Sequence, residues 1–125
     1  HDDERYLRFM NGVTEKYPNI KLIATTVRTV HSASCNSLRA VCVKDKRLVL
    51  SGTFEKLSVL DRIGSGDSFA AGLLFALFSN KDIEYALEFA LAHAAFAMTT
   101  PGDTSMATEE DIENIVNKKS AKVVR

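Results

Sequence analysis

The chain has 125 residues, which is enough for one domain or a large piece of one. Hydrophobic residues make up 46% of it and charged residues 26%, proportions typical of a globular protein. Sixteen basic residues balance sixteen acidic ones, which argues against a nucleic-acid partner or binding to an anionic membrane surface. An anionic ligand would therefore have to be held by a local site.

The sequence leads us to expect neither a signal peptide nor a membrane-spanning segment. The acidic start, residues 1–5, does not fit a signal peptide. The longest apolar run, residues 69–78, is too short to span a bilayer. Cys35 and Cys42 form no Cys-x-x-Cys pair and have no zinc-ligand spacing with histidines. Reduced thiols in a cytoplasmic protein are the preferred interpretation, and a single disulfide remains the alternative.

In the first half of the chain, the pattern predicts one helix and three strands. Apolar residues recur at helical spacing over 3–17, and Pro18 follows as a helix stop. A buried strand is expected at 21–26 and a polar loop at 31–37. Two further strands are expected at 38–43 and 47–51, joined by a charged hairpin turn at residues 44–46.

The second half of the chain predicts three helices. The first, about 66–79, is apolar on nearly every face and is therefore expected to be buried. The second, about 83–98, is rich in alanine, which allows close backbone approach. Thr108 resembles the cap of the third, and residues 118–125 are expected to add a short strand or to fray. This order of elements predicts a three-layer α/β domain with an antiparallel pair of strands at one edge of the sheet.

The turn Gly64-Ser65-Gly66, followed by Asp67 and an apolar helix, is the most informative stretch for function. Such a turn leaves backbone N–H groups unpaired at a helix N-terminus, where the helix dipole favours an anion. Asp67 would then stand as a proton acceptor beside a bound phosphate. The alternative is an ordinary strand-to-helix turn in which Asp67 caps the helix. The string is not a Walker P-loop, because no Gly-Lys-Ser/Thr follows.

The same stretch resembles the C-terminal signature of the ribokinase-like (PfkB) carbohydrate kinases. The matching residues are Asp61, Gly64, Gly66, Asp67, Phe69 and Gly72, whereas Arg62 and Ser65 replace the usual Thr and Ala. The Asp-Arg-Ile form is most similar to the 2-keto-3-deoxygluconate kinase branch. Residues 25–28 and 98–103 also fit that branch, so the resemblance extends over about 21–117.

The resemblance implies a ribokinase-like three-layer α/β/α fold with a mostly parallel sheet and an antiparallel edge hairpin. Members of the family are considerably longer than this chain, and their sugar-binding and lid half precedes the signature. Residues 1–125 are therefore expected to be the C-terminal part of the kinase domain, inactive when isolated. The complete protein is expected to be cytoplasmic and is a candidate homo-oligomer.

The implied activity is direct transfer of the γ-phosphoryl group of ATP, with Mg²⁺, to a sugar or sugar-acid hydroxyl. Asp67 would accept the hydroxyl proton, and the amides of Gly64, Ser65 and Gly66 would stabilise the transferring phosphate. The substrate implied is 2-keto-3-deoxygluconate. The alternatives are a fructokinase or ribokinase type of kinase, or a non-catalytic nucleotide-binding fragment.

The resemblance also implies a nucleotide site made from several segments. Thr26 and Arg28 are candidates for a phosphate or substrate contact, with a strand end and an ordinary surface arginine as the alternative. Candidate nucleotide contacts further along are His93, Ala94, Ala97, Thr100 and Gly102. For His93 the alternative is a residue satisfied locally in a tightly packed core helix. Asp61 is the candidate ligand of a monovalent cation such as K⁺.

Overall fold

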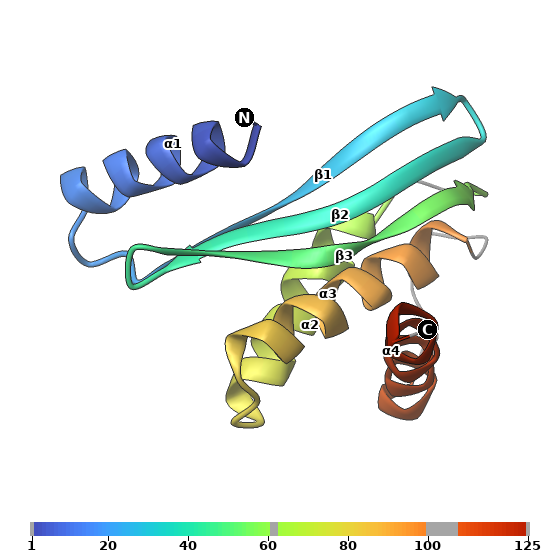
Figure 1. Cartoon of the computed structure of the whole chain (residues 1–125). Helices are drawn as coiled ribbons and strands as arrows, with labels where there is room; N and C mark the ends of the chain where they lie inside the picture. Colours follow the sequence, from blue (N-terminus) through green and yellow to red (C-terminus); the bar gives the residue numbers. More distant parts are fainter. Residues whose placement is uncertain (1, 61–62, 100–107, 125) are drawn as a thin grey trace.

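The computed structural model describes residues 2–60, 63–99 and 108–124 of the chain. Its elements are α1 (Asp2–Lys16), β1 (Leu22–Ser32), β2 (Cys35–Lys44), β3 (Arg47–Ser58), α2 (Ser65–Phe78), α3 (Ile83–Met98) and α4 (Glu109–Val124). Figure 1 shows the three strands as a layer between α1 and the group formed by α2, α3 and α4. Helices therefore cover both faces of the sheet, as the three-layer prediction requires.

The three strands form a sheet in the order β1-β2-β3, and both neighbouring pairs are antiparallel. The expected mostly parallel sheet is therefore not found among the described strands. The reason is the length of the connections, because two-residue turns can join only antiparallel strands. In the turn between β2 and β3, Asp45 and Lys46 both have positive φ, 54° and 62°, as a tight hairpin turn demands.

The strands are longer than the sequence predicts, and the polar loop expected at 31–37 does not exist. β1 continues to Ser32 and β2 begins at Cys35, so this polar stretch is the tip of a hairpin. A hydrogen bond of 2.8 Å between His31 Nε2 and Ser37 Oγ joins the two strands there. The Ser37 hydroxyl also donates to Glu55 Oε2 in β3, at 3.2 Å. Polar side chains that satisfy one another across strands explain why a polar sequence is extended here.

The main core lies between the sheet and α3. Leu87 and Leu91 of α3 are fully buried, and they pack in one cluster with Leu38, Ala40 and Cys42 of β2. Polar groups fix the helix to β3, since the Gly52 amide donates to Glu88 Oε2 at 2.8 Å. α3 begins at the predicted residue because the Asp82 side chain accepts a hydrogen bond from the Tyr85 amide, at 2.8 Å.

α1 covers the opposite face of the sheet with its predicted apolar stripe. Met10 is only 2% exposed and packs with Val41 and Val43 of β2, which point away from the main core. An ion pair of 3.2 Å between Arg39 and Asp3 fastens the start of the helix. The period of two in β2 thus separates two cores, one on each face of the sheet.

One expectation about the helices is wrong, and one of two alternatives for the end of the chain is excluded. α2 is not buried on all sides, because the side chains of Leu74 and Phe78 are 53% and 83% exposed. The stretch after residue 117 forms no strand, since α4 continues to Val124. The predicted start of α4 is confirmed: Thr108 Oγ1 accepts from the Asp111 amide, and Asp111 Oδ2 accepts from the Thr108 amide. None of the helices that the structure describes is long and apolar enough to cross a membrane.

Both cysteine thiols are free, as the preferred interpretation of the sequence expects. Cys42 is fully buried in the main core, whereas Cys35 lies partly exposed at the start of β2. Burial raises the pKa of the Cys42 thiol to about 11, and the nearby Glu84 carboxylate adds to the shift. Cys42 is therefore a structural apolar side chain and not a reactive thiol.

Candidate active site at the start of α2

The backbone at Gly64 sets the start of α2. This residue has φ 89° and ψ −6°, a left-handed conformation that favours glycine, and it occupies the N-cap position. The first helical hydrogen bond runs from the Ser68 amide to the Gly64 carbonyl, at 2.9 Å. No side chain caps the helix. The alternative in which Asp67 is the N-cap is therefore wrong, because Asp67 is the third residue of the first turn.

This first turn presents the groups that an anion-binding site needs. The amides of Gly66 and Asp67 belong to the turn in which a helix supplies no acceptor, and both residues are exposed. The positive end of the helix dipole acts at the same place. The Asp67 carboxylate thus lies beside a position suited to an anion, in reach of solvent and ligand. The sequence predicted this combination at Gly64, Ser65, Gly66 and Asp67, and the structure places all four in one turn.

Replacing Gly64 by alanine tests the geometry of the turn. An L-residue at φ 89° brings its Cβ too close to the following carbonyl, which costs about 1–2 kcal/mol. We expect Gly64→Ala to lower the free energy of unfolding by that amount, measured by urea denaturation. Gly66→Ala is the matched control, because Gly66 lies inside the helix and a Cβ there meets nothing within 4 Å. Equal losses in both variants would contradict the left-handed cap.

His93 of α3 is bonded to this first turn. Its Nδ1 lies 2.7 Å from the carbonyl oxygen of Ser68. A carbonyl oxygen only accepts, so Nδ1 carries the proton of this hydrogen bond, and in the tautomer with a single ring proton Nε2 is an acceptor. The two helices approach closely at Gly72, where an added Cβ would lie 3.1 Å from Ala90 Cα and 3.2 Å from His93 Cβ. One of the two His93 nitrogens therefore has its partner within the protein, in the first turn of α2.

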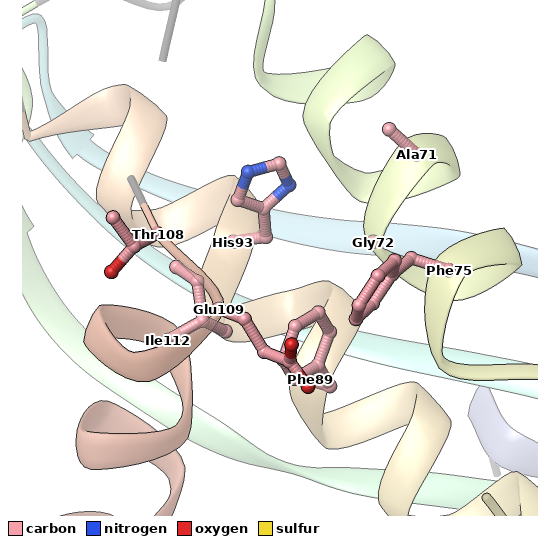
Figure 2. A pocket seen from close by; sticks show the side chains of 8 residues that line it. All are labelled: Ala71, Gly72, Phe75, Phe89, His93, Thr108, Glu109 and Ile112. Carbon is pink, nitrogen blue, oxygen red and sulfur yellow. The ribbon is translucent and has the colours of Figure 1, made fainter. Parts of the chain in front are cut away.

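A cleft of about 340 Å³ opens between α2, α3 and the start of α4 (Figure 2). Its lining residues are Ala71, Gly72, Phe75, Phe89, His93, Thr108, Glu109 and Ile112. In Figure 2, His93 lies toward one end and the rings of Phe75 and Phe89 toward the other. These two rings stack with centroids 5.7 Å apart. The size and the largely apolar, aromatic walls suit a small planar group.

The rim of the cleft carries an acid, Glu109, with a raised pKa. A hydrogen bond to the Glu113 side chain raises the pKa of Glu109, and the proximity of that second carboxylate adds to the shift. Of the cleft residues, sequence reasoning named only His93 as a binding residue. Phe75, Phe89 and Ile112 come from three different helices, and each fits a core position when its own helix is considered alone.

The structure brings Thr26 and Arg28 to the face of the sheet that α2 and α3 cover. They pair with Ala40 and Leu38 of β2, and directly opposite residues of antiparallel strands point to the same face. Ala40 and Leu38 belong to the main core. Arg28 is exposed and Thr26 is partly buried, so the guanidinium is available to a ligand on this face.

The other predicted site residues are buried, or they lie outside the residues that the structure describes. Ala94 and Ala97 are 1% and 6% exposed, and Ala94 packs in the main core, so close packing is the role the structure gives it. Neither is among the cleft residues. Asp61, Thr100 and Gly102 lie outside the described residues. Within residues 2–60, 63–99 and 108–124, no three His, Cys, Asp or Glu side chains gather in a way that could hold a metal ion.

Comparison with known proteins identifies the class of protein to which this site belongs. Residues 39–111 match the model of the pfkB family carbohydrate kinases. The match contains β3, α2 and most of the cleft, and it covers more than half of the chain. The chain belongs to the pfkB family of carbohydrate kinases.

Individual relatives point to kinases of sugar acids. The chain is 36% identical over 66 residues to 5-dehydro-2-deoxygluconokinase of Bacillus subtilis, a match that covers 52% of this chain and 20% of that protein. It is 32% identical over 66 residues to 2-dehydro-3-deoxygalactonokinase of Haloferax volcanii, covering 53% and 21%. The crystal structure of 2-dehydro-3-deoxygluconokinase from Thermotoga maritima superposes with a TM-score of 0.85 and 31% identity, covering 91% and 34%.

The coverage of these matches shows how much of each relative's length this chain spans. It spans about a fifth of the curated relatives and about a third of the Thermotoga maritima structure. The superposition includes nearly all of this chain, so the antiparallel sheet and its helices are a recognisable portion of the ribokinase-like fold. The expectation of a PfkB kinase most similar to 2-keto-3-deoxygluconate kinase is confirmed at the level of the family and of its similar relatives.

Proposed function

We propose that this chain is the C-terminal part of a kinase that transfers the γ-phosphoryl group of ATP to a hydroxyl of a keto-deoxy sugar acid. The observation that supports this most strongly is the first turn of α2, where exposed amides and the Asp67 carboxylate stand together. One group binds a phosphate and the other accepts a proton, which are the two needs of phosphoryl transfer to a hydroxyl.

In the proposed reaction the substrate hydroxyl oxygen attacks the γ-phosphorus of ATP. Asp67 takes the hydroxyl proton as the new O–P bond forms and the bond from the γ-phosphorus to the β-bridging oxygen breaks. ADP leaves with the electrons of that bond. The amides of the first turn, with the helix dipole, stabilise the negative charge of the transferring group. These donors are fixed by the Gly64 cap before the reaction and need no reorganisation.

We place the adenine of the nucleotide in the cleft between α2, α3 and α4. Stacked phenylalanine rings provide apolar contact, and the free Nε2 of His93 provides one hydrogen-bond acceptor. The bond from His93 to Ser68 ties this cleft to the first turn of α2. A nucleotide that occupies the cleft would thus have its phosphates near the anion-binding turn. In this proposal Mg²⁺ arrives with ATP, held mainly by phosphate oxygens and water.

The substrate class is proposed from two observations. The names of three relatives all describe kinases of dehydro-deoxy-gluconate or dehydro-deoxy-galactonate compounds. Arg28 offers a guanidinium on the face of α2, and this group pairs with a carboxylate or phosphate in bidentate fashion. We propose 2-keto-3-deoxygluconate as the substrate, with Arg28 as a contact to a phosphate or to the acid group.

The remaining parts of the kinase are proposed to lie in an N-terminal half that this chain does not contain. That half would supply the sugar-binding residues and the parallel strands of the sheet. Leu74 and Phe78 of α2 are exposed apolar side chains outside the cleft, and such a half would cover them. A cytoplasmic location, assembly into homo-oligomers and a K⁺ site at Asp61 are further parts of the proposal.

A backbone-amide NMR titration of the chain with magnesium–ATP tests the nucleotide site. We expect shifts at Gly64 to Asp67 and at the cleft residues Gly72 and His93. The amide of Gly12 in α1, on the other face of the sheet, is the internal control and should stay in place. A titration with Mg²⁺ alone separates metal effects. Shifts confined to residues outside the first turn and the cleft would overturn the proposed site.

A further inference from the structure

Asn36 of β2 is a buried amide without a partner. Its side chain is 1% exposed, and neither Oδ1 nor Nδ2 makes a hydrogen bond. A buried amide in this state is destabilising, because it has lost its water and gained nothing in exchange. Because an unpaired amide in a well-packed strand lowers the stability of the fold, its presence there indicates a functional role. Neither the proposed reaction nor the proposed nucleotide cleft uses it.

The register of the sheet shows where Asn36 points. Residues two apart in a strand point to the same face, so Asn36 shares its face with Leu38 and Ala40 of the main core. This is the face covered by α2 and α3. Its neighbour across the sheet in β1 is Val30, two residues beyond Arg28 on that same face. The amide of Asn36 therefore projects toward the helical layer on the side that also presents Arg28.

Three contacts place Asn36 at the level of the first turn of α2. Asn36 pairs with Leu57 of β3, and three residues further along, the Leu60 amide donates to the Met98 carbonyl at the end of α3. One and a half turns before that end, His93 contacts Ser68. The end of β3, the last turns of α3 and the first turn of α2 thus lie at one end of the sheet, together with Asn36.

The chemistry of an amide suits the ligand proposed for that turn. Nδ2 donates hydrogen bonds without adding charge, and it would join the helix amides in binding anionic oxygens. An aspartate at the same position would repel a phosphate, and an apolar residue would offer nothing. We propose that Asn36 is a binding residue for the phosphoryl groups of the nucleotide, left unpaired in the ligand-free chain so that it can donate to a phosphate oxygen. This inference rests on the proposed function.

The test follows the side-chain NH₂ signals of Asn36 while the chain is titrated with magnesium–ATP and, separately, with inorganic phosphate. We expect these signals to move with the backbone amides of Gly66 and Asp67 and with the same dissociation constant. Because Asn36→Leu removes the proposed hydrogen bond to a charged phosphate oxygen, we expect this variant to bind magnesium–ATP about tenfold more weakly, or weaker still. The same variant should raise the thermal midpoint by about 3 °C or more, since the unpaired amide is gone.

Asn11→Leu is the matched control, because Asn11 Oδ1 is also buried and unpartnered but lies in α1, on the other face of the sheet. It should leave magnesium–ATP affinity unchanged. If Gly66 and Asp67 shift while the Asn36 side chain does not, and Asn36→Leu binds as the wild type does, this inference fails and the nucleotide site stands. If Gly66 and Asp67 do not shift, both fail. Should Asn36→Leu not fold, the side-chain signals of the wild-type chain decide.

Discussion

Replacing Asp67 by asparagine is expected to lower the turnover of the complete kinase by about 100-fold or more, the range for a positioned general base. That factor corresponds to about 2.7 kcal/mol of activation free energy. Asparagine keeps the shape of the side chain and its place in the first turn of α2, but it cannot accept the proton of the substrate hydroxyl. The measurement is the rate of ADP formation with 2-keto-3-deoxygluconate at saturating magnesium–ATP.

Asp82→Asn is the matched control for this variant. Asp82 is also an acid at the start of a helix, and asparagine caps a helix as well as aspartate does. Asp82 is the N-cap of α3 and is not among the residues that line the cleft. The turnover of the Asp82→Asn enzyme should therefore equal that of the wild type. A folded Asp67→Asn enzyme that retains near-normal turnover would show that Asp67 is not the base.

The starts of α3 and α4 were predictable from this sequence because local groups determine them. Asp82 and Thr108 cap α3 and α4 through hydrogen bonds to amides three residues ahead, contacts that depend only on nearby sequence. The limits of the strands were not predictable in the same way. The polar residues His31 and Ser37 are extended because they bond to each other across the hairpin, and Ser37 also reaches Glu55, far along the chain.

The candidate site also has one part that local sequence determines and another that depends on the packing of distant segments. The turn around Gly64 was predictable because a glycine pair before an acid and an apolar helix has a local conformational meaning, and the left-handed φ of Gly64 confirms it. The cleft was not predictable, since Phe75, Phe89 and Ile112 line it only after three helices have packed together. Asn36 could not be recognised either, because its isolation depends on the register of the whole sheet.

Gly72→Val tests the contact that holds the two parts of the site together. A Cβ at Gly72 would lie 3.1 Å from Ala90 Cα and 3.2 Å from His93 Cβ, atoms that cannot swing away. α2 and α3 must therefore separate, and overpacking of this kind costs about 1–3 kcal/mol. We expect the upper end of that range, about 3 kcal/mol, because the neighbours are backbone-fixed and valine is branched at Cβ. Urea denaturation measures this loss in the free energy of unfolding, and we expect the m-value to be unchanged.

Gly12→Val is the control, because a Cβ at Gly12 in α1 meets nothing within 4 Å and the same substitution there adds no overpacking. We expect a change of less than about 0.5 kcal/mol at that position, since valine is slightly better than glycine in a helix. Equal losses at the two glycines would mean that α2 and α3 are not in close contact in solution. The separation forced by Gly72→Val also moves Ser68 away from His93 and breaks the hydrogen bond that links the cleft to the first turn of α2. Gly72→Val should therefore lose affinity for magnesium–ATP even at temperatures where it remains folded, whereas Gly12→Val should bind as tightly as the wild type.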